Sequence, residues 1–217
     1  MNKGAVNQIL NKYIAGNVEG AGYTVPEQET ELCKLAFKYR TDKCQKIKHP
    51  FTPFYYDLLN PQRRSIRKIL EIGVGLKRAH THSDNRTGAS LYMWNDFLPN
   101  AQIYGADIDP LTMFKDGRIK TFLCDQSKPE DLANLIMATG SDLDIVIDDA
   151  SHVPGLQVAT CKTLMPLLKK DVLYIIEDVA DQGIERRLRS FDTSVISLRG
   201  SNGRRYPDDK LIVVRNS

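Results

Sequence analysis

Two carboxylates stand side by side at Asp148 and Asp149, and His152 follows three residues after the second. Residues 145–147, directly before them, are β-branched and apolar, which favours a buried strand. Open α/β sheets bind ligands at the carboxyl ends of their strands. A carboxylate pair beside an imidazole suits a hard metal ion next to a general base. The pattern therefore predicts a strand that ends at a site; the alternative is a strand followed by a solvated loop.

A second acidic pair, Glu177 and Asp178, follows the apolar run 172–176. With Asp149, these residues would supply three hard oxygen ligands, which select Mg²⁺, Mn²⁺ or Ca²⁺ over Zn²⁺. His152 is the candidate catalytic base, because neutral imidazole accepts a proton near physiological pH. The alternatives are first-turn acids favoured by a helix dipole and a histidine packed under the loop.

A glycine turn, Gly73-Val74-Gly75, follows the first clear strand, at residues 67–72. Such a turn lets the backbone approach a ligand closely, and it occurs with nucleotide, flavin and adenosyl cofactors. The next strand, 102–107, ends at Asp107, where a carboxylate can accept hydrogen bonds from ribose. Strand 119–124 is followed by Asp125 in the same way.

Short apolar strands alternate with helical segments along most of the chain. This alternation predicts an α/β fold, Rossmann-like and doubly wound, with a seven-stranded and mostly parallel sheet. Strands 194–198 and 211–214 lie too close for a helical crossover, so we expect an antiparallel C-terminal hairpin. Helices at 5–14 and 28–39 and an irregular, aromatic lid or ligand-contacting segment at 39–56 would form an N-terminal part, 1–60, packed on the core, 61–217. The alternative for 39–56 is a loop leading into a helix capped by Thr52.

The composition is that of a globular chain of 217 residues with a net charge of +3, which neither requires nor excludes nucleic acid. No apolar run approaches the roughly 20 residues needed to cross a bilayer. The N-terminus lacks an apolar signal segment, and the four cysteines form no C-x-x-C pair. We therefore expect a cytoplasmic protein with reduced thiols and no membrane partner.

Several motifs carry a family resemblance. Residues 70–75, Gly105-Ala106-Asp107 and Asp125 resemble the cofactor motifs of class I S-adenosylmethionine-dependent methyltransferases. A narrower resemblance is to the metal-dependent sugar O-methyltransferases of macrolide biosynthesis. The motifs that carry it are Thr41-Asp42-Lys43, His49-x-Phe51-Thr52-x-x-Tyr55, Gly88-Ala89-Ser90, Asp148-Asp149-x-Ser151-His152 and Glu177-Asp178. The resemblance covers roughly residues 35–215. The sequence departs from the family pattern at Arg40 and Ala150, where those enzymes tend to have glycine.

The resemblance implies S-adenosylmethionine and Mg²⁺ or Mn²⁺ as cofactors. The acceptor would be a small molecule or glycan with vicinal hydroxyls, and a homo-oligomer is compatible with it. Asp149, Glu177 and Asp178 would hold the metal, and His152 with Asp149 would be catalytic. The cofactor would be bound by Glu71, Gly73, Gly75, Asp107, Asp125, Gln126 and Asp148, with Thr41, Tyr55 and Ser90 around the methionine carboxylate.

Three other functions stay open. A catechol-type small-molecule O-methyltransferase also uses a metal held by carboxylates. A nucleic-acid methyltransferase would use the arginines at 186, 187, 189, 204 and 205, which otherwise form a solvated face. A nicotinamide oxidoreductase is disfavoured, because Arg78 stands where its fingerprint needs a third glycine.

Overall fold

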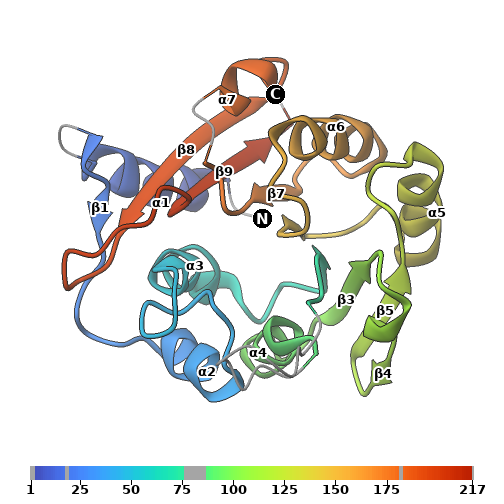
Figure 1. Ribbon diagram of the computed structural model, residues 1–217, viewed down its shortest axis with the longest axis horizontal. Helices are drawn as coiled ribbons and strands as arrows, with labels where there is room; N and C mark the ends of the chain where they lie inside the picture. The colour runs from blue at the N-terminus through green and yellow to red at the C-terminus, as the bar shows by residue number, and fades with distance from the viewer. Residues whose placement is uncertain (1–2, 18–19, 76–86, 181–182, 217) are drawn as a thin grey trace.

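The computed structural model describes residues 3–17, 20–75, 87–180 and 183–216. Within them, nine strands form one sheet in the order β1-β8-β9-β7-β6-β2-β3-β5-β4 (Figure 1). The strands are β1 Tyr23–Thr24, β2 Lys68–Ile72, β3 Gln102–Asp107, β4 Lys115–Asp116, β5 Ile119–Leu123, β6 Ile145–Asp148, β7 Leu173–Ile176, β8 Asp192–Arg199 and β9 Lys210–Arg215.

The centre of the sheet is parallel, from β7 through β6, β2 and β3 to β5. Strand β9 runs antiparallel to both β7 and β8, so the predicted C-terminal hairpin is confirmed. The sequence predicts seven strands, and the described residues contain two more, both short edge strands. Strand β1 is parallel to β8, and β4 is antiparallel to β5. Each has only two residues, too few to leave an alternating pattern in the sequence.

Helices cover both faces of the sheet (Figure 1). Helices α1 to α4 share one apolar core with alternate strand residues such as Ile69 and Ile145. Helices α5 to α7 share the other with Leu70 and Val146. The helices are α1 Lys3–Ala15, α2 Glu31–Tyr39, α3 Phe51–Leu59, α4 Ala89–Phe97, α5 Pro129–Thr139, α6 Pro154–Leu164 and α7 Ile184–Arg187, with 3₁₀ turns η2 Asn60–Gln62, η3 Pro110–Thr112 and η4 Met165–Leu167. No helix in these ranges is both long and apolar enough to cross a membrane.

The aromatic segment predicted to be irregular is, from Phe51 onward, the buried helix α3. It is apolar on most sides because it packs between α1, α2 and the sheet. Thr52 is not its N-cap: Pro50 holds that position, and the Thr52 hydroxyl donates to the Cys33 sulfur. Arg78, which stands where the nicotinamide fingerprint needs a third glycine, lies in residues 76–86, outside the described residues.

The chain order reverses between β2 and β6, since β2 is flanked by β3 on one side and β6 on the other. Ligands of open α/β sheets bind outside the carboxyl ends of the strands at such a switch point. Gly73 follows β2 there, and the Asp149 amide after β6 donates to the Ile72 carbonyl at 2.8 Å. Gly73 has φ 101°, and a Cβ on it would lie 2.2 Å from the Asp149 carbonyl oxygen. Glycine is therefore required where the two strand ends meet.

Candidate active site

Two cavities lie at the switch point, of about 450 and 310 Å³. Both are lined by Gly73, Gly75, Asp149 and Ala150, so together they form one elongated depression along the glycine turn. The larger one, here the β3–β5 cavity, also contacts the ends of those strands. The smaller one, here the α4 cavity, also contacts the start of helix α4.

The β3–β5 cavity brings together three residues predicted to face the adenosyl part of a cofactor: Asp107, Asp125 and Gln126. One Asp107 oxygen accepts hydrogen bonds from the backbone amides of Val74 and Gly75, at 2.9 and 3.2 Å. This carboxylate therefore fixes the shape of the glycine turn as well as lining the cavity.

The Gln126 amide is already engaged by protein groups. Its Nε2 donates to Thr160 Oγ1 at 2.9 Å and to Asp148 Oδ1 at 3.3 Å, and its Oε1 accepts from the Ser151 amide. Gln126 thereby ties the loop after β6 to helix α6.

The α4 cavity brings together Asp149, His152 and Asp178, as the sequence predicted. His152 Nε2 lies 3.8 Å from Asp149 Oδ1 and 3.5 Å from Asp178 Oδ2. The Asp149 carboxylate raises the pKa of the half-exposed His152. Burial, and then the charge of Asp149, raise the pKa of Asp178 to about 6. Two carboxylates and an imidazole thus converge on one point of this cavity.

A buried lysine lies behind this cluster. Lys43 Nζ is 2.6 Å from Asp149 Oδ2, 2.5 Å from Glu177 Oε2 and 3.4 Å from Glu71 Oε1. Its side chain is 1% exposed. Burial alone would lower the Lys43 pKa, but the three carboxylates raise it well above its ordinary value. The same ammonium opposes the effect of burial on Asp149, and the net pKa of Asp149 is lowered. Lys43 is therefore a fixed positive charge among the acids.

Glu177 points to this lysine and not toward His152. Its second oxygen accepts from the Tyr55 hydroxyl at 2.5 Å, and its carboxyl group is buried. Burial raises the pKa of Glu177 well above the usual range. Among the described residues, Asp149, His152 and Asp178 each place a ligand atom here, all within 4.8 Å of one another. Glu177 is not part of this group. The structure thus brings two of the three predicted acidic ligands, Asp149 and Asp178, together with His152, while Glu177 faces Lys43.

Glu71 and Asp148 also lie behind the cavity walls. Glu71 accepts from Ser90 Oγ at 2.6 Å and from Trp94 Nε1 at 2.5 Å. Asp148 accepts from the Tyr174 hydroxyl at 2.9 Å, and its burial raises its pKa to about 7. Thr41 and Ser90 line the α4 cavity. Glu71, Asp148 and Tyr55 are not among the described residues that line either cavity. Direct cofactor contact by these three does not follow from the geometry.

The residues at the site fit both groups implied by the sequence. The donor set of two carboxylates and an imidazole at Asp149, Asp178 and His152 suits a divalent cation. The glycine turn leaves open a depression with acids along its length, which suits a cationic, ribose-bearing cofactor.

The strand order, the switch-point cavity and the glycine turn define the fold of class I methyltransferases. No protein-family model matches the chain. Solved structures of a similar fold include the MycE methyltransferase of the mycinamycin biosynthetic pathway. In complex with Mg and SAH, it has a TM-score of 0.60 and 34% identity, over 70% of this chain and 38% of that one. Its complex with Mg, SAH and mycinamycin VI has a TM-score of 0.67 at 27% identity, over 87% and 55%.

Within this class, the chain resembles the sugar O-methyltransferases of antibiotic pathways. It is 36% identical over 152 residues to the mycinamicin VI 2''-O-methyltransferase of Micromonospora griseorubida, covering 70% of this chain and 37% of that protein. It is 35% identical over 149 residues to the 8-demethyl-8-alpha-L-rhamnosyl tetracenomycin-C 2'-O-methyltransferase of Streptomyces olivaceus, covering 68% and 37%. The chain thus spans little more than a third of the length of these relatives.

Sequence reasoning assigned no role to Lys43 or His49, although both lie in the motifs that carry the resemblance. The burial of a lysine depends on tertiary contacts that its neighbours in sequence do not reveal. One signal was available: four acids predicted to gather at adjacent strand ends need a compensating cation.

Proposed function

We propose that this chain carries the catalytic core of an S-adenosylmethionine-dependent, divalent-metal-dependent O-methyltransferase that acts on a sugar hydroxyl. The observation that carries the proposal is the convergence of Asp149, His152 and Asp178 in a cavity continuous with the glycine turn. The similarity to sugar O-methyltransferases supports the reaction class.

The cofactor lies along the depression formed by the two cavities. Asp107 and Asp125 face its adenosyl part in the β3–β5 cavity, and Gly73 and Gly75 allow it to approach the backbone. Ser90 and Thr41 line the far end, where the methionine part fits. The carboxylate of Asp149, which lines both cavities, favours a positively charged sulfonium between them.

Asp149 and Asp178 hold the divalent cation, with His152 beside them. A bound cation supplies positive charge that lowers the pKa of a hydroxyl group next to it. His152 Nε2 faces both carboxylates and is half exposed, so it can take the proton from an acceptor that enters from solvent. Lys43 keeps Asp149 charged and fixes its direction.

The acceptor is a glycoside with neighbouring hydroxyl groups. The named relatives act on rhamnosyl tetracenomycin C and on mycinamicin VI, so these two compounds are the first acceptors to test. A pair of adjacent hydroxyl oxygens would add hard donors to those of Asp149 and Asp178.

The test is the Asp149→Asn variant, with Asp142→Asn as the control. Asp142 is 65% exposed and precedes β6, at the opposite end of that strand from Asp149. We expect Asp149→Asn to lose at least about 100-fold in methyl transfer, because it removes a charged ligand, while its affinity for S-adenosylhomocysteine changes little by calorimetry. Asp142→Asn should retain turnover. Undiminished turnover in EDTA, or by Asp149→Asn, would refute the proposal.

A further inference from the structure

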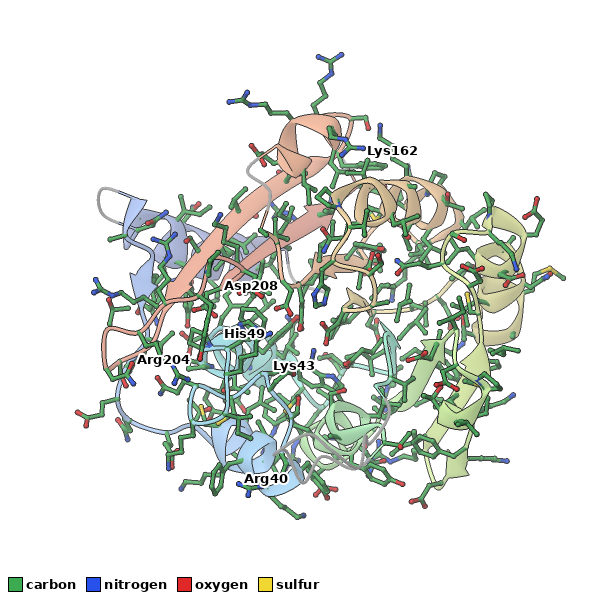
Figure 2. All side chains as sticks on the ribbon, viewed as in Figure 1. Arg40, Lys43, His49, Lys162, Arg204 and Asp208 are labelled. Atoms are coloured by element: carbon green, nitrogen blue, oxygen red, sulfur yellow. The ribbon has the colours of Figure 1, made fainter. Side chains whose placement is uncertain are left out.

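His49 is fully buried between two carboxylates on the far side of Asp178 from His152. Its Nδ1 lies 2.7 Å from Asp209 Oδ1, and its Nε2 lies 3.3 Å from Asp178 Oδ1. The ring stacks on Phe51 with centroids 4.8 Å apart, which fixes its plane. Figure 2 labels His49 and Asp208 near each other in the middle of the molecule, between helix α3 and the C-terminal strands.

A count of protons at this histidine leaves one contact unexplained. An ionised carboxylate only accepts hydrogen bonds, so Nδ1 must donate to Asp209. In the neutral ring, Nε2 then carries a lone pair, and it faces another acceptor, Asp178 Oδ1. Both atoms are buried and without a hydrogen-bond partner among the described residues. A cation that binds both atoms would satisfy them.

Metal-bound histidines have this arrangement, with one ring nitrogen donating to a carboxylate and the other free to bind the ion. A third donor is in place, because ligand atoms of His49, Asp178 and Asp208 all lie within 4.8 Å of one another. We propose that His49, Asp178 and Asp208 form a second divalent-cation site, separate from the cluster of Asp149 and His152. An imidazole with two carboxylates favours Zn²⁺ or Mn²⁺ over Mg²⁺.

Asp178 is shared by the two sites. Its Oδ1 faces His49, and its Oδ2 lies 3.5 Å from His152 Nε2. A carboxylate whose two oxygens face two separate nitrogen donors is placed to bridge two ions, as carboxylates do in two-metal centres. Asp178 also holds a left-handed backbone conformation, with φ 52°, which costs of order 1–3 kcal/mol in a residue other than glycine. The surrounding structure thus imposes the direction of this side chain.

Lys48 competes with an ion at the second site. Its Nζ lies 3.9 Å from Asp178 Oδ2 and 3.7 Å from Asp208 Oδ2, and its side chain is 38% exposed. The ammonium faces the carboxylates of Asp178 and Asp208, while Asp209 faces His49, so the acids outnumber the lysine here. The exposed lysine can move into solvent when an ion binds.

The experiment measures Zn²⁺ binding to the whole, chelator-treated chain by calorimetry, with bound zinc counted after dialysis. We expect two ions per chain in the wild type and one in Asp208→Asn, whose side chain is 26% exposed and whose change should leave the fold intact. Lys48→Met should bind one of the two ions at least about fivefold more tightly. Lys46→Met is its control, because Lys46 pairs with Glu29 outside the cluster.

The two sites are separated by a second pair of variants. Asp149→Asn should keep the ion that Asp208→Asn loses, whether or not the chain methylates any acceptor, so this proposal does not rest on the proposed function. His49→Asn should lose the same ion as Asp208→Asn, with circular dichroism as the check on folding. An ion count that Asp208→Asn leaves unchanged, whether the wild type binds one ion or two, overturns the proposal.

Discussion

Replacing Lys43 with methionine removes the buried ammonium and preserves most of the side-chain volume. The change leaves Asp149, Glu177 and Glu71 facing one another without a compensating charge. The free energy of unfolding should fall substantially, because buried acids that lose their partner keep the full cost of dehydration.

The size of the effect follows from the contact distances. At an effective dielectric constant of about 20, each of the 2.5 and 2.6 Å contacts of Lys43 is worth about 6 kcal/mol before dehydration is subtracted. Dehydration of the ammonium and the carboxylates cancels much of this gain. Breaking a buried pair typically costs a net 3–5 kcal/mol, and we expect Lys43→Met to fall in this range.

Equilibrium urea unfolding at pH 7 in EDTA, followed by circular dichroism, measures this loss. Lys46→Met is the matched control, since Lys46 lies three residues away and its ion pair with Glu29, 2.7 Å long, is half exposed. That pair should contribute little to stability, because solvent screens exposed charges. Mn²⁺ in place of EDTA should stabilise Lys43→Met more than the wild type, because it restores positive charge beside Asp149.

Equal losses in Lys43→Met and Lys46→Met would refute the reasoning. They would mean that the buried acids are neutral in the folded chain, and that the ammonium contributes no more than a surface charge.

Three further changes test other parts of the structure. Gly73→Ala should cost about 2–4 kcal/mol and abolish binding of S-adenosylhomocysteine in calorimetry, because its Cβ would meet the Asp149 carbonyl at 2.2 Å. Trp94→Phe leaves a buried Glu71 oxygen without its donor and should cost about 1–3 kcal/mol in urea unfolding. Burial is the largest single effect on the pKa of Asp96, and it raises that pKa. The hydrogen bonds from helix α2 together outweigh burial, so the pKa falls below 3.8. This stabilisation exists above pH 4 and is lost as pH falls through the lowered pKa. Asp96→Asn should therefore cost less than about 1 kcal/mol at pH 7, and still less as the pH falls through the lowered pKa.

The strands and their acidic ends could be predicted because apolar runs and terminal carboxylates are local features of sequence. The direction of each acid is harder to predict. Side chains alternate between the faces of a strand, so adjacent acids cannot both point into one cavity. Asp148 and Asp149 divide in this way, the first toward Tyr174 and the second toward the cavity. Beyond the end of β7, Glu177 faces Lys43, whereas Asp178, in a left-handed backbone conformation, lines the cavity with His152.

Other differences come from tertiary contacts. Helix α3 has an aromatic, proline-containing sequence that resembles a loop, and its burial on most sides becomes clear only when α1, α2 and the sheet surround it. Arg40 is an instructive departure from the family pattern. It ends helix α2 with φ 62°, a left-handed conformation that glycine adopts without strain.

The pairing of β1 with β8 has a consequence for biosynthesis. Tyr23 and Thr24 align with Leu198 and Arg199, and α1 packs against the same strand. Helix α1 and β1 are synthesised well before β8, so they gain these native neighbours only after β8 has been made. Closure of this edge of the sheet must follow release of the C-terminal hairpin, and a nascent chain halted before β8 should leave α1 and β1 open to proteases.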